Sequence, residues 1–199
     1  MAAEKQKETS FGQFFFGLVI IGMIVLVFTI SPAYLERIYM AERQAVQAIL
    51  GEAEDEIYQE AYSEPSQGLH EGTAALARDA GQGTPVSLWA NDRATVLWLW
   101  GNLISYRLVM LFSWMLCIQP LILGAFIDGY YVRESRKYSF VSQSPIRHKV
   151  GVRSATLIFV ATVCSIVMPL AFSPLVVPLA LVSIGMASWL WISNLQKRL

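Results

Sequence analysis

Three residues of types that can perform nucleophilic catalysis lie within one short stretch of the sequence: Asp128, Ser144 and His148. A serine, a histidine and a carboxylate are the groups of an acyl-transfer triad. None of them stands in a G-x-S-x-G pattern between a strand and a helix, the setting that exposes a nucleophilic serine. We therefore interpret His148 as a polar residue of a basic loop and predict no catalytic residue.

Metal and nucleotide chemistry are equally poorly supported by the residue pattern. The other histidine, His70, has no second histidine or cysteine nearby, whereas a protein metal site needs three or four ligands. Cys117 and Cys164 lie in apolar stretches, where cysteine acts as a small hydrophobic residue. Gly81 and Gly83 have polar loop residues on both sides and lack the strand and helix of a phosphate-binding loop. We expect no metal, no cofactor and no enzymatic activity.

The composition points to a membrane protein. Hydrophobic residues make up 55% of the 199-residue chain and charged residues 15%, against roughly 25% charged residues in soluble domains. The mean hydropathy is +0.46 and the net charge is zero. Such values exclude intrinsic disorder and the strongly basic kind of nucleic-acid-binding domain. The apolar residues fall in blocks of about 20, the length that crosses a bilayer as a helix.

The order of these blocks predicts an all-α protein with four transmembrane helices. The spans are expected at residues 11–30, 108–127, 155–171 and 175–192. The 38 residues from 155 to 192 carry no charge and would form a helix of about 57 Å, which is too long for one span. We therefore place a tight turn at Phe172-Ser173-Pro174. The alternative is that the chain has only two long spans.

Small residues recur along one side of the fourth span. Ala180, Ser183 and Ala187 are separated by three and four residues. This spacing favours close approach of a second helix. The pattern does not say whether that helix belongs to this chain or to another protein.

A helical segment is predicted outside the membrane over residues 31–107. Ser31-Pro32 is a typical helix start, and residues 33–61 follow as one amphipathic helix. Its apolar stripe comprises Leu35, Ile38, Val46, Ile49, Leu50, Ala53 and Ile57, and its acidic face comprises Glu42, Glu52, Glu54, Asp55, Glu56 and Glu60. Residues 63–85 are expected to form a loop, after which helical spacing resumes and merges into the second span. The two helices are predicted to pack as an antiparallel pair.

Charge predicts which side of the membrane each segment occupies. Residues 31–107 hold five basic and eleven acidic residues, a net charge of −6, whereas residues 129–154 hold six basic and one acidic residue, a net charge of +5. Basic residues are retained in the cytoplasm. We therefore place residues 1–10, 128–154 and 193–199 in the cytoplasm of a bacterium and residues 31–107 in the periplasm.

The basic loop, residues 128–154, allows two interpretations. Its charge alone is explained by attraction to anionic lipids at the cytoplasmic face. However, aromatic residues such as Tyr138 and Phe140 alternate with the basic ones, a mixture typical of docking surfaces. Asp128-Gly129 is expected to end the second span, and Ser144-Pro145 to start the next helix. Because a carboxylate is unfavourable at a helix C-terminus, we expect Asp128 to pair with Arg133 or Arg136.

One stretch of the chain resembles a known family. It comprises Ile127-Asp128-Gly129, Arg133, Tyr138, Phe140, Ser144-Pro145 and His148-Lys149. It is similar to small inner-membrane proteins of integrating conjugative elements and conjugative plasmids, encoded beside the type IV coupling ATPase. The layout of one span, a long outer segment and three clustered spans is also similar. The chain departs from the family's pattern before His148, where relatives place an aromatic residue.

The resemblance implies a part in conjugative DNA transfer. It leads us to expect a non-enzymatic accessory protein of the bacterial inner membrane that associates with the coupling ATPase or with secretion-channel proteins. The residues expected at the docking surface are Asp128, Gly129, Arg133, Arg136, Tyr138, Phe140, Ser144, Arg147, His148 and Lys149. Homo-oligomers are compatible with the sequence, and no sequence-specific nucleic-acid binding is expected. A membrane sensor and a small transporter or channel subunit remain alternatives, although the chain has no output domain and its spans lack ionisable residues.

Overall fold

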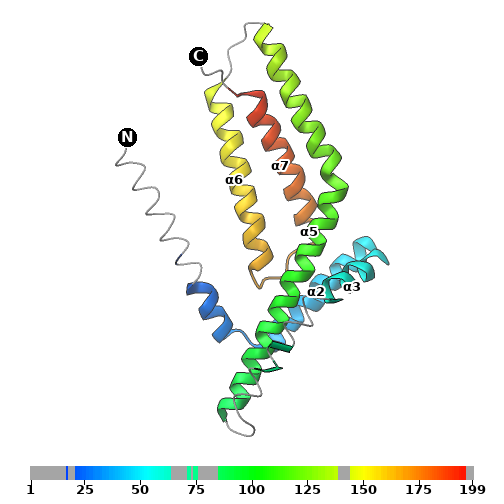
Figure 1. Ribbon diagram of the computed structural model, residues 1–199, viewed down its shortest axis with the longest axis vertical. Coiled ribbons are helices and arrows are strands. Elements are labelled where there is room, and N and C mark those ends of the chain that lie inside the picture. The colour runs from blue at the N-terminus through cyan, green and yellow to red at the C-terminus, as the bar shows by residue number, and fades with distance from the viewer. Residues whose placement is uncertain are drawn as a thin grey trace.

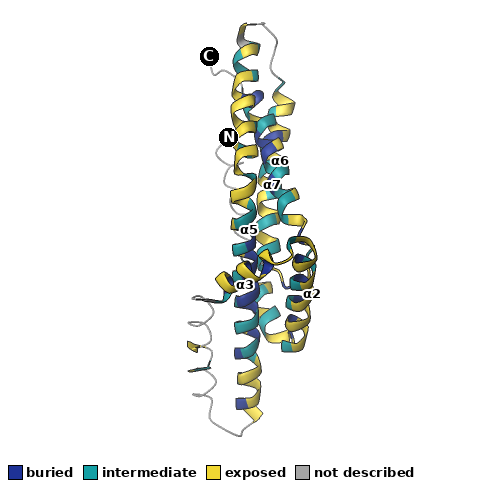
Figure 2. Cartoon of the chain, turned by 90° about the vertical axis from the view of Figure 1, so that its right-hand side faces the viewer, coloured by how far each residue is buried: buried dark blue, intermediate teal, exposed yellow. Residues whose placement is uncertain are grey.

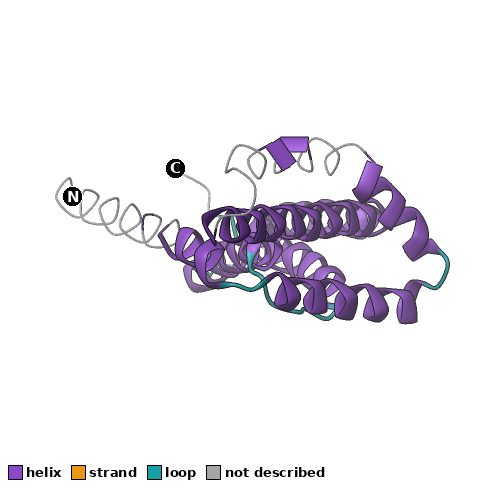
Figure 3. Ribbon diagram, turned by 90° about the horizontal axis from the view of Figure 1, so that it is seen from below, coloured by secondary structure: helices purple, strands orange, loops and turns teal. Residues whose placement is uncertain are grey.

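The computed structural model describes residues 17, 21–63, 71–72, 74–75, 85–138 and 144–195. A helical stretch over Ile21–Thr29 comes first. It is followed by α2 (Pro32–Leu50), α3 (Ala53–Ser63), α5 (Pro85–Tyr138), α6 (Pro145–Val167) and α7 (Val176–Ser193). Within these residues Figure 3 shows only helices and connecting loops, so the predicted all-α class is confirmed for the described part of the chain.

Three helices, α5, α6 and α7, are long and apolar enough to cross a membrane. The stretch Ile21–Thr29 and α2 would add a fourth candidate if counted together, but they are bent by 102° at Ser31. Most of the predicted first span, residues 11–30, lies outside the described residues. The predicted turn between the third and fourth spans is confirmed, because α6 ends at Val167 and α7 begins at Val176.

Helix α7 lies between α5 and α6 and packs against both (Figure 1). Small residues allow this close approach. A Cβ atom added to Gly151 of α6 would lie 2.7 Å from the backbone nitrogen of Trp191 in α7, and one added to Gly129 of α5 would lie 3.3 Å from the carbonyl oxygen of Trp189. Ala187 of the predicted small-residue face is buried. At Ala187 the approaching helix is α6 of the same chain, because a Cβ atom added to Gly151 would lie 3.1 Å from the Ala187 carbonyl oxygen.

The outer helix is broken, where the sequence predicted one continuous helix over residues 33–61. Helix α2 ends at Leu50 and α3 begins at Ala53. Gly51, between them, has a φ of 59°, and its backbone N–H donates to the carbonyl of Gln47 over 2.9 Å. Glycine enters this region of backbone conformation without steric cost, so it ends the first helix and redirects the chain.

The prediction that a helix ends at Asp128-Gly129 is wrong. Helix α5 is continuous for 54 residues and passes through both residues to Tyr138. Gly129 serves close packing against α7 here, not helix termination. At 1.5 Å per residue α5 is about 81 Å long, so it extends well beyond a hydrocarbon thickness of about 30 Å. The same helix covers both the predicted second span and the second helix of the predicted outer segment.

Burial changes along the length of the molecule (Figure 2). The helices α5, α6 and α7 expose apolar side chains such as Phe112, Leu121, Leu157 and Phe159. The most deeply buried hydrophobic side chains, Leu35, Val46, Val96, Leu103 and Tyr106, come from α2 and from the part of α5 that precedes the predicted second span. The apolar exterior is what a lipid environment requires.

Candidate functional site

The predicted docking residues gather at one end of the three-helix unit. The C-terminal end of α5, the first turn of α6 and the end of α7 all lie at this end (Figure 1). Tyr138 is 78% exposed, and the side chains of Arg147 and Lys149 are also exposed. Phe140 lies outside the described residues. We call this end, with Tyr138 and residues 144–149 at its centre, the basic end.

The helix start predicted for the basic end is confirmed. Ser144 is the N-cap of α6, and its Oγ accepts a hydrogen bond from the backbone nitrogen of Arg147 over 3.5 Å. Pro145 follows as the first helical residue, where its missing N–H has no cost. The cap fixes the direction in which Arg147, His148 and Lys149 leave the first turn.

At the basic end, Asp128 and Arg136 of α5 have their partners at the end of α7. The indole N–H of Trp189 donates to Asp128 Oδ2 over 2.6 Å, where the sequence suggested an arginine partner. Arg136 donates from Nη1 to the carbonyl of Ser193 over 3.2 Å and to Asn194 Oδ1 over 3.3 Å. A cation at a helix C-terminus interacts favourably with the helix dipole. These contacts attach the basic end of α5 to the end of α7.

Two residues of the basic end keep a buried nitrogen without a hydrogen-bond partner in the structure. They are Nε of Arg133, one helical turn beyond Gly129, and Nδ1 of His148, one turn before Gly151. Both glycines pack against the second half of α7. A buried polar atom without a partner is costly, which makes these two positions suited to an incoming hydrogen-bonding group.

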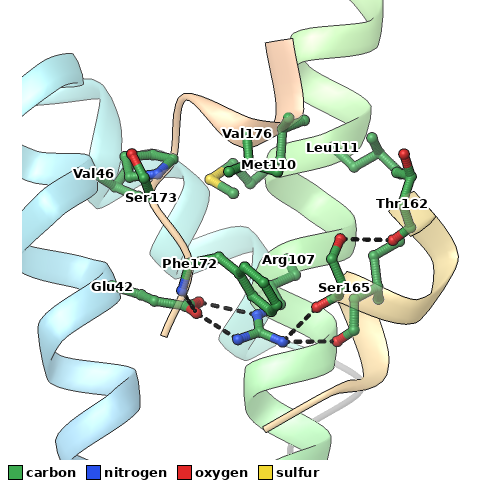
Figure 4. Close-up of a pocket in the computed structure, with 13 residues that line it drawn as sticks. Glu42, Val46, Arg107, Met110, Leu111, Thr162, Ser165, Phe172, Ser173 and Val176 are labelled. Carbon is green, nitrogen blue, oxygen red and sulfur yellow. Dashed lines mark hydrogen bonds and ion pairs between the residues drawn. The ribbon is translucent and has the colours of Figure 1, made fainter. Parts of the chain in front are cut away.

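A second site, which the sequence did not predict, lies where α2 crosses α5 (Figure 4). Glu42 was expected on the acidic, solvated face of the outer helix, but it is buried at 4% exposure, and so is Arg107. Arg107 Nε donates to Glu42 Oε2 over 3.0 Å, and its Nη2 donates to Glu42 Oε1. The two side chains thus form a buried bidentate ion pair, the strongest geometry for such a contact.

Arg107 also binds the end of α6. Its Nη1 donates to the carbonyls of Ser165, Ile166 and Met168 over 2.7, 3.1 and 2.6 Å. Its Nη2 donates to the carbonyl of Leu170 as well. The last carbonyls of a helix have no partner within it, so the guanidinium satisfies them and meets the negative end of the helix dipole.

Glu42 extends the same network to the turn between α6 and α7. Its Oε1 accepts a hydrogen bond from the backbone nitrogen of Phe172 over 2.9 Å. The Arg107 guanidinium lies 5.2 Å from the centre of the Phe172 ring. A cavity of about 30 Å³ adjoins the pair and is lined by Val46, Met110 and Thr162 among others. One ion pair therefore joins α2, α5 and the α6–α7 turn.

Two other residues of α5, seven and fourteen positions before Arg107, also donate hydrogen bonds to backbone carbonyls. Arg93, Trp100 and Arg107 share one face of the helix, because seven residues make almost two full turns. Arg93 Nη1 donates to the carbonyls of Val27, Phe28 and Ile30, each over 2.9 Å, at the end of the first helical stretch. Trp100 Nε1 donates to the carbonyl of Val167 over 2.8 Å. This face of α5 therefore binds the carbonyl ends of two other helices.

A second buried carboxylate joins α2, α3 and α5. Glu54 is fully buried and accepts from Arg43 Nε over 2.8 Å and from the hydroxyl of Tyr106 over 3.3 Å. The Arg43 guanidinium lies 3.8 Å from the centre of the Tyr58 ring. The hydrogen bond to Glu54 raises the pKa of Arg43 above its usual value. The ion pair between Arg43 and Glu54 holds α3 against α2 across the break at Gly51.

A sequence signal for both buried carboxylates exists. Glu42 stands four residues from both Ile38 and Val46 of the apolar stripe, and Glu54 stands three residues before the buried Ile57. A carboxylate within an apolar stripe is a candidate for a buried ion pair, because charged residues are rarely buried without a partner. The spacing therefore indicated that both carboxylates are buried, but the prediction followed residue type alone and placed them on the solvated face.

Comparison with known proteins identifies the family. No curated protein and no solved structure matches the chain. Residues 44–196 match the family described as IncC plasmid conjugative DNA transfer protein DtrJ-like. The match covers more than half of the chain and includes α3, α5, α6 and α7. It agrees with the conjugative family that the sequence resembles. The chain therefore belongs to the DtrJ-like family of conjugative DNA transfer proteins.

Proposed function

We propose that this chain is a non-enzymatic accessory protein of the bacterial inner membrane that binds the conjugative coupling ATPase, or a protein of the secretion channel, through its basic end. It would cross the membrane four times, with both termini in the cytoplasm. Membership of a conjugative transfer family supports the process, and the three apolar helices support the location. The membrane topology and the partner are our proposals.

The observation that carries the proposal is the composition of the basic end. Tyr138 and Ile146 are 78% and 73% exposed, and the exposed Arg147 and Lys149 lie beside them. Interfaces draw most of their binding energy from a few aromatic and arginine anchors. The fixed partners of Asp128 and Arg136 on α7 hold this end in one arrangement, which lowers the entropy lost on binding.

The opposite end of α6 and α7 has a structural role in this proposal. There the pair Glu42–Arg107 attaches the acidic outer helices to the α6–α7 turn. The outer segment carries the net charge of −6 and the basic end lies in the segment of +5. The positive-inside rule then favours a basic end that faces the cytoplasm, where a coupling ATPase has its catalytic domain.

The proposal is tested by co-purification of the full-length chain with the coupling ATPase encoded by the same element. The test variant combines Tyr138→Ala with Arg147→Gln, which removes the two anchors. The matched control combines Tyr34→Ala with Arg37→Gln, which removes the same residue types from exposed positions of α2. Loss of two anchors of roughly 1–2 kcal/mol each predicts at least a tenfold loss of the recovered ATPase.

The control variant should recover as much ATPase as the wild-type chain, and both variants should be present in the membrane at normal amounts. Transfer frequency should fall with the test variant alone. Equal recovery with the test variant and the control would show that the basic end does not bind this partner.

A further inference from the structure

A groove between α5, α6 and α7 opens close to the basic end. Its volume is about 380 Å³. Val150, Ser154 and Ile158 line it from α6, Ser183 and Met186 from α7, and Ala125 from α5. Val150 and Met186 are 51% and 69% exposed, so the groove is open to the exterior of the helix bundle. We propose that this groove binds one anionic phospholipid, with an acyl chain between the helices and the phosphate beside Arg147.

The position of the groove relative to the bilayer supports a lipid. Arg153 is the last charged residue before the uncharged stretch that begins at Ala155. Val150 therefore lies at the level of the headgroups and Ile158 at the level of the acyl chains. A groove that crosses this boundary matches a molecule with a charged head and an apolar tail. The inference requires only that the chain lies in a membrane and does not depend on the proposed ATPase partner.

Charge favours an anionic headgroup. Arg147 precedes Gly151 by one helical turn, so it stands on the side of α6 that faces α7 and the groove. Lys149 and Arg153 are exposed on neighbouring faces of the same helix. The carboxylates near this end, Asp128 and Glu134, are both on α5, and Asp128 accepts a hydrogen bond from Trp189. Positive charge is therefore concentrated on the α6 side of the groove.

Two serine hydroxyls in the otherwise apolar wall of the groove can bind polar groups of a lipid. Thr156 and Thr162 of α6 bind their hydroxyls to the carbonyls of Val152 and Ile158, as is usual in membrane helices. Ser154 and Ser183, which line the groove, form no such bond in the described part of the structure. Their hydroxyls can donate to the ester or phosphate oxygens of a lipid seated there.

The experiment is native mass spectrometry of the purified full-length chain after incubation with phosphatidylglycerol or phosphatidylcholine of the same acyl chains. The wild-type chain is expected to retain one phosphatidylglycerol with a preference of more than tenfold, because each nearby basic residue contributes about 1 kcal/mol. An excess of inorganic phosphate should not displace it, since the acyl chain supplies part of the affinity.

Three variants locate the site. Ser183→Leu fills the groove and should abolish the bound lipid, whereas Thr156→Leu, the same kind of enlargement on the exposed face of α6, should retain it. Arg147→Gln should lower the preference for phosphatidylglycerol roughly fivefold. Arg147 is a surface residue, so this variant tests the site even if Ser183→Leu does not fold.

Three outcomes would overturn the inference. They are equal retention of the two lipids by the wild-type chain, wild-type retention by a folded Ser183→Leu variant, and an unchanged preference in Arg147→Gln. No ATPase is present in this assay, so its result does not depend on the proposed function. Likewise, a negative result in this assay would not contradict the proposed docking to the ATPase.

Discussion

Replacing Arg107 with methionine should destabilise the chain severely. Methionine keeps the unbranched apolar stem of the side chain but leaves Glu42, which is 4% exposed, without its cationic partner. Breaking a buried ion pair by removing one partner costs about 3–5 kcal/mol. The carbonyls of Ser165, Met168 and Leu170 would lose their donor as well. Because some of these carbonyls can bind water instead, we expect a total loss of about 4 kcal/mol.

Thermal unfolding of the purified chain in detergent measures this loss. For a chain of this size 1 kcal/mol corresponds to a change in Tm of about 2–4 °C, so Arg107→Met should lower Tm by roughly 8–16 °C. Arg37→Met, at an exposed position of α2, is the matched control and should leave Tm within about 2 °C of the wild-type value.

A double variant separates the ion pair from the packing of the side chains. Glu42→Met combined with Arg107→Met removes both charges, so no unpaired buried charge remains. It should be more stable than Arg107→Met alone, because replacing a whole buried pair with apolar residues is often nearly neutral. If Arg107→Met unfolds at the same temperature as Arg37→Met, the network does not hold the two parts of the chain together and our account of it is wrong.

Three further predictions follow from the packing and the charge pattern. Ile57→Asp should open the outer helices to protease, whereas Ile49→Asp should not, because Ile57 is 7% and Ile49 45% exposed; equal digestion would contradict the packing of α3 on α5. Gly151→Leu should lower the free energy of unfolding by about 1–3 kcal/mol through a clash with the α7 backbone, whereas Gly124→Leu, with open space around it, should not; equal Tm values would refute the close approach. In a background lacking Cys117 and Cys164, an impermeant thiol reagent applied to spheroplasts should label a cysteine at Ser66 and spare one at Ser139; equal labelling would refute the proposed topology.

The two Ser-Pro helix starts and the break between the last two predicted spans could be predicted from the sequence because local rules determine them. Ser31-Pro32 and Ser144-Pro145 are N-caps in the structure, as the Ser-Pro pattern indicated. The turn around Ser173-Pro174 separates α6 from α7, since a single helix would have exceeded the bilayer. In each case the residues involved are close in sequence, so no knowledge of tertiary contacts was needed.

Tertiary contacts explain what the sequence did not reveal. Gly129 has the residue type of a helix terminus, but its role is set by α7, which is about 60 residues away in the chain. Glu42 has the residue type of a solvated face, but Arg107 lies 65 positions later. The docking surface was inferred from composition and resemblance. The structure adds the partners of Asp128 and Arg136 on α7, which no local pattern contains.

The most direct test of the central claim is site-specific photo-crosslinking in mating cells. A photoreactive amino acid replaces Tyr138 at the basic end, and in a control strain it replaces Tyr34 on α2; both side chains are exposed. We predict a covalent adduct with the coupling ATPase from position 138 and none from position 34. An adduct from position 34 alone, or equal adducts from both, would contradict the claim that the basic end binds the transfer machinery.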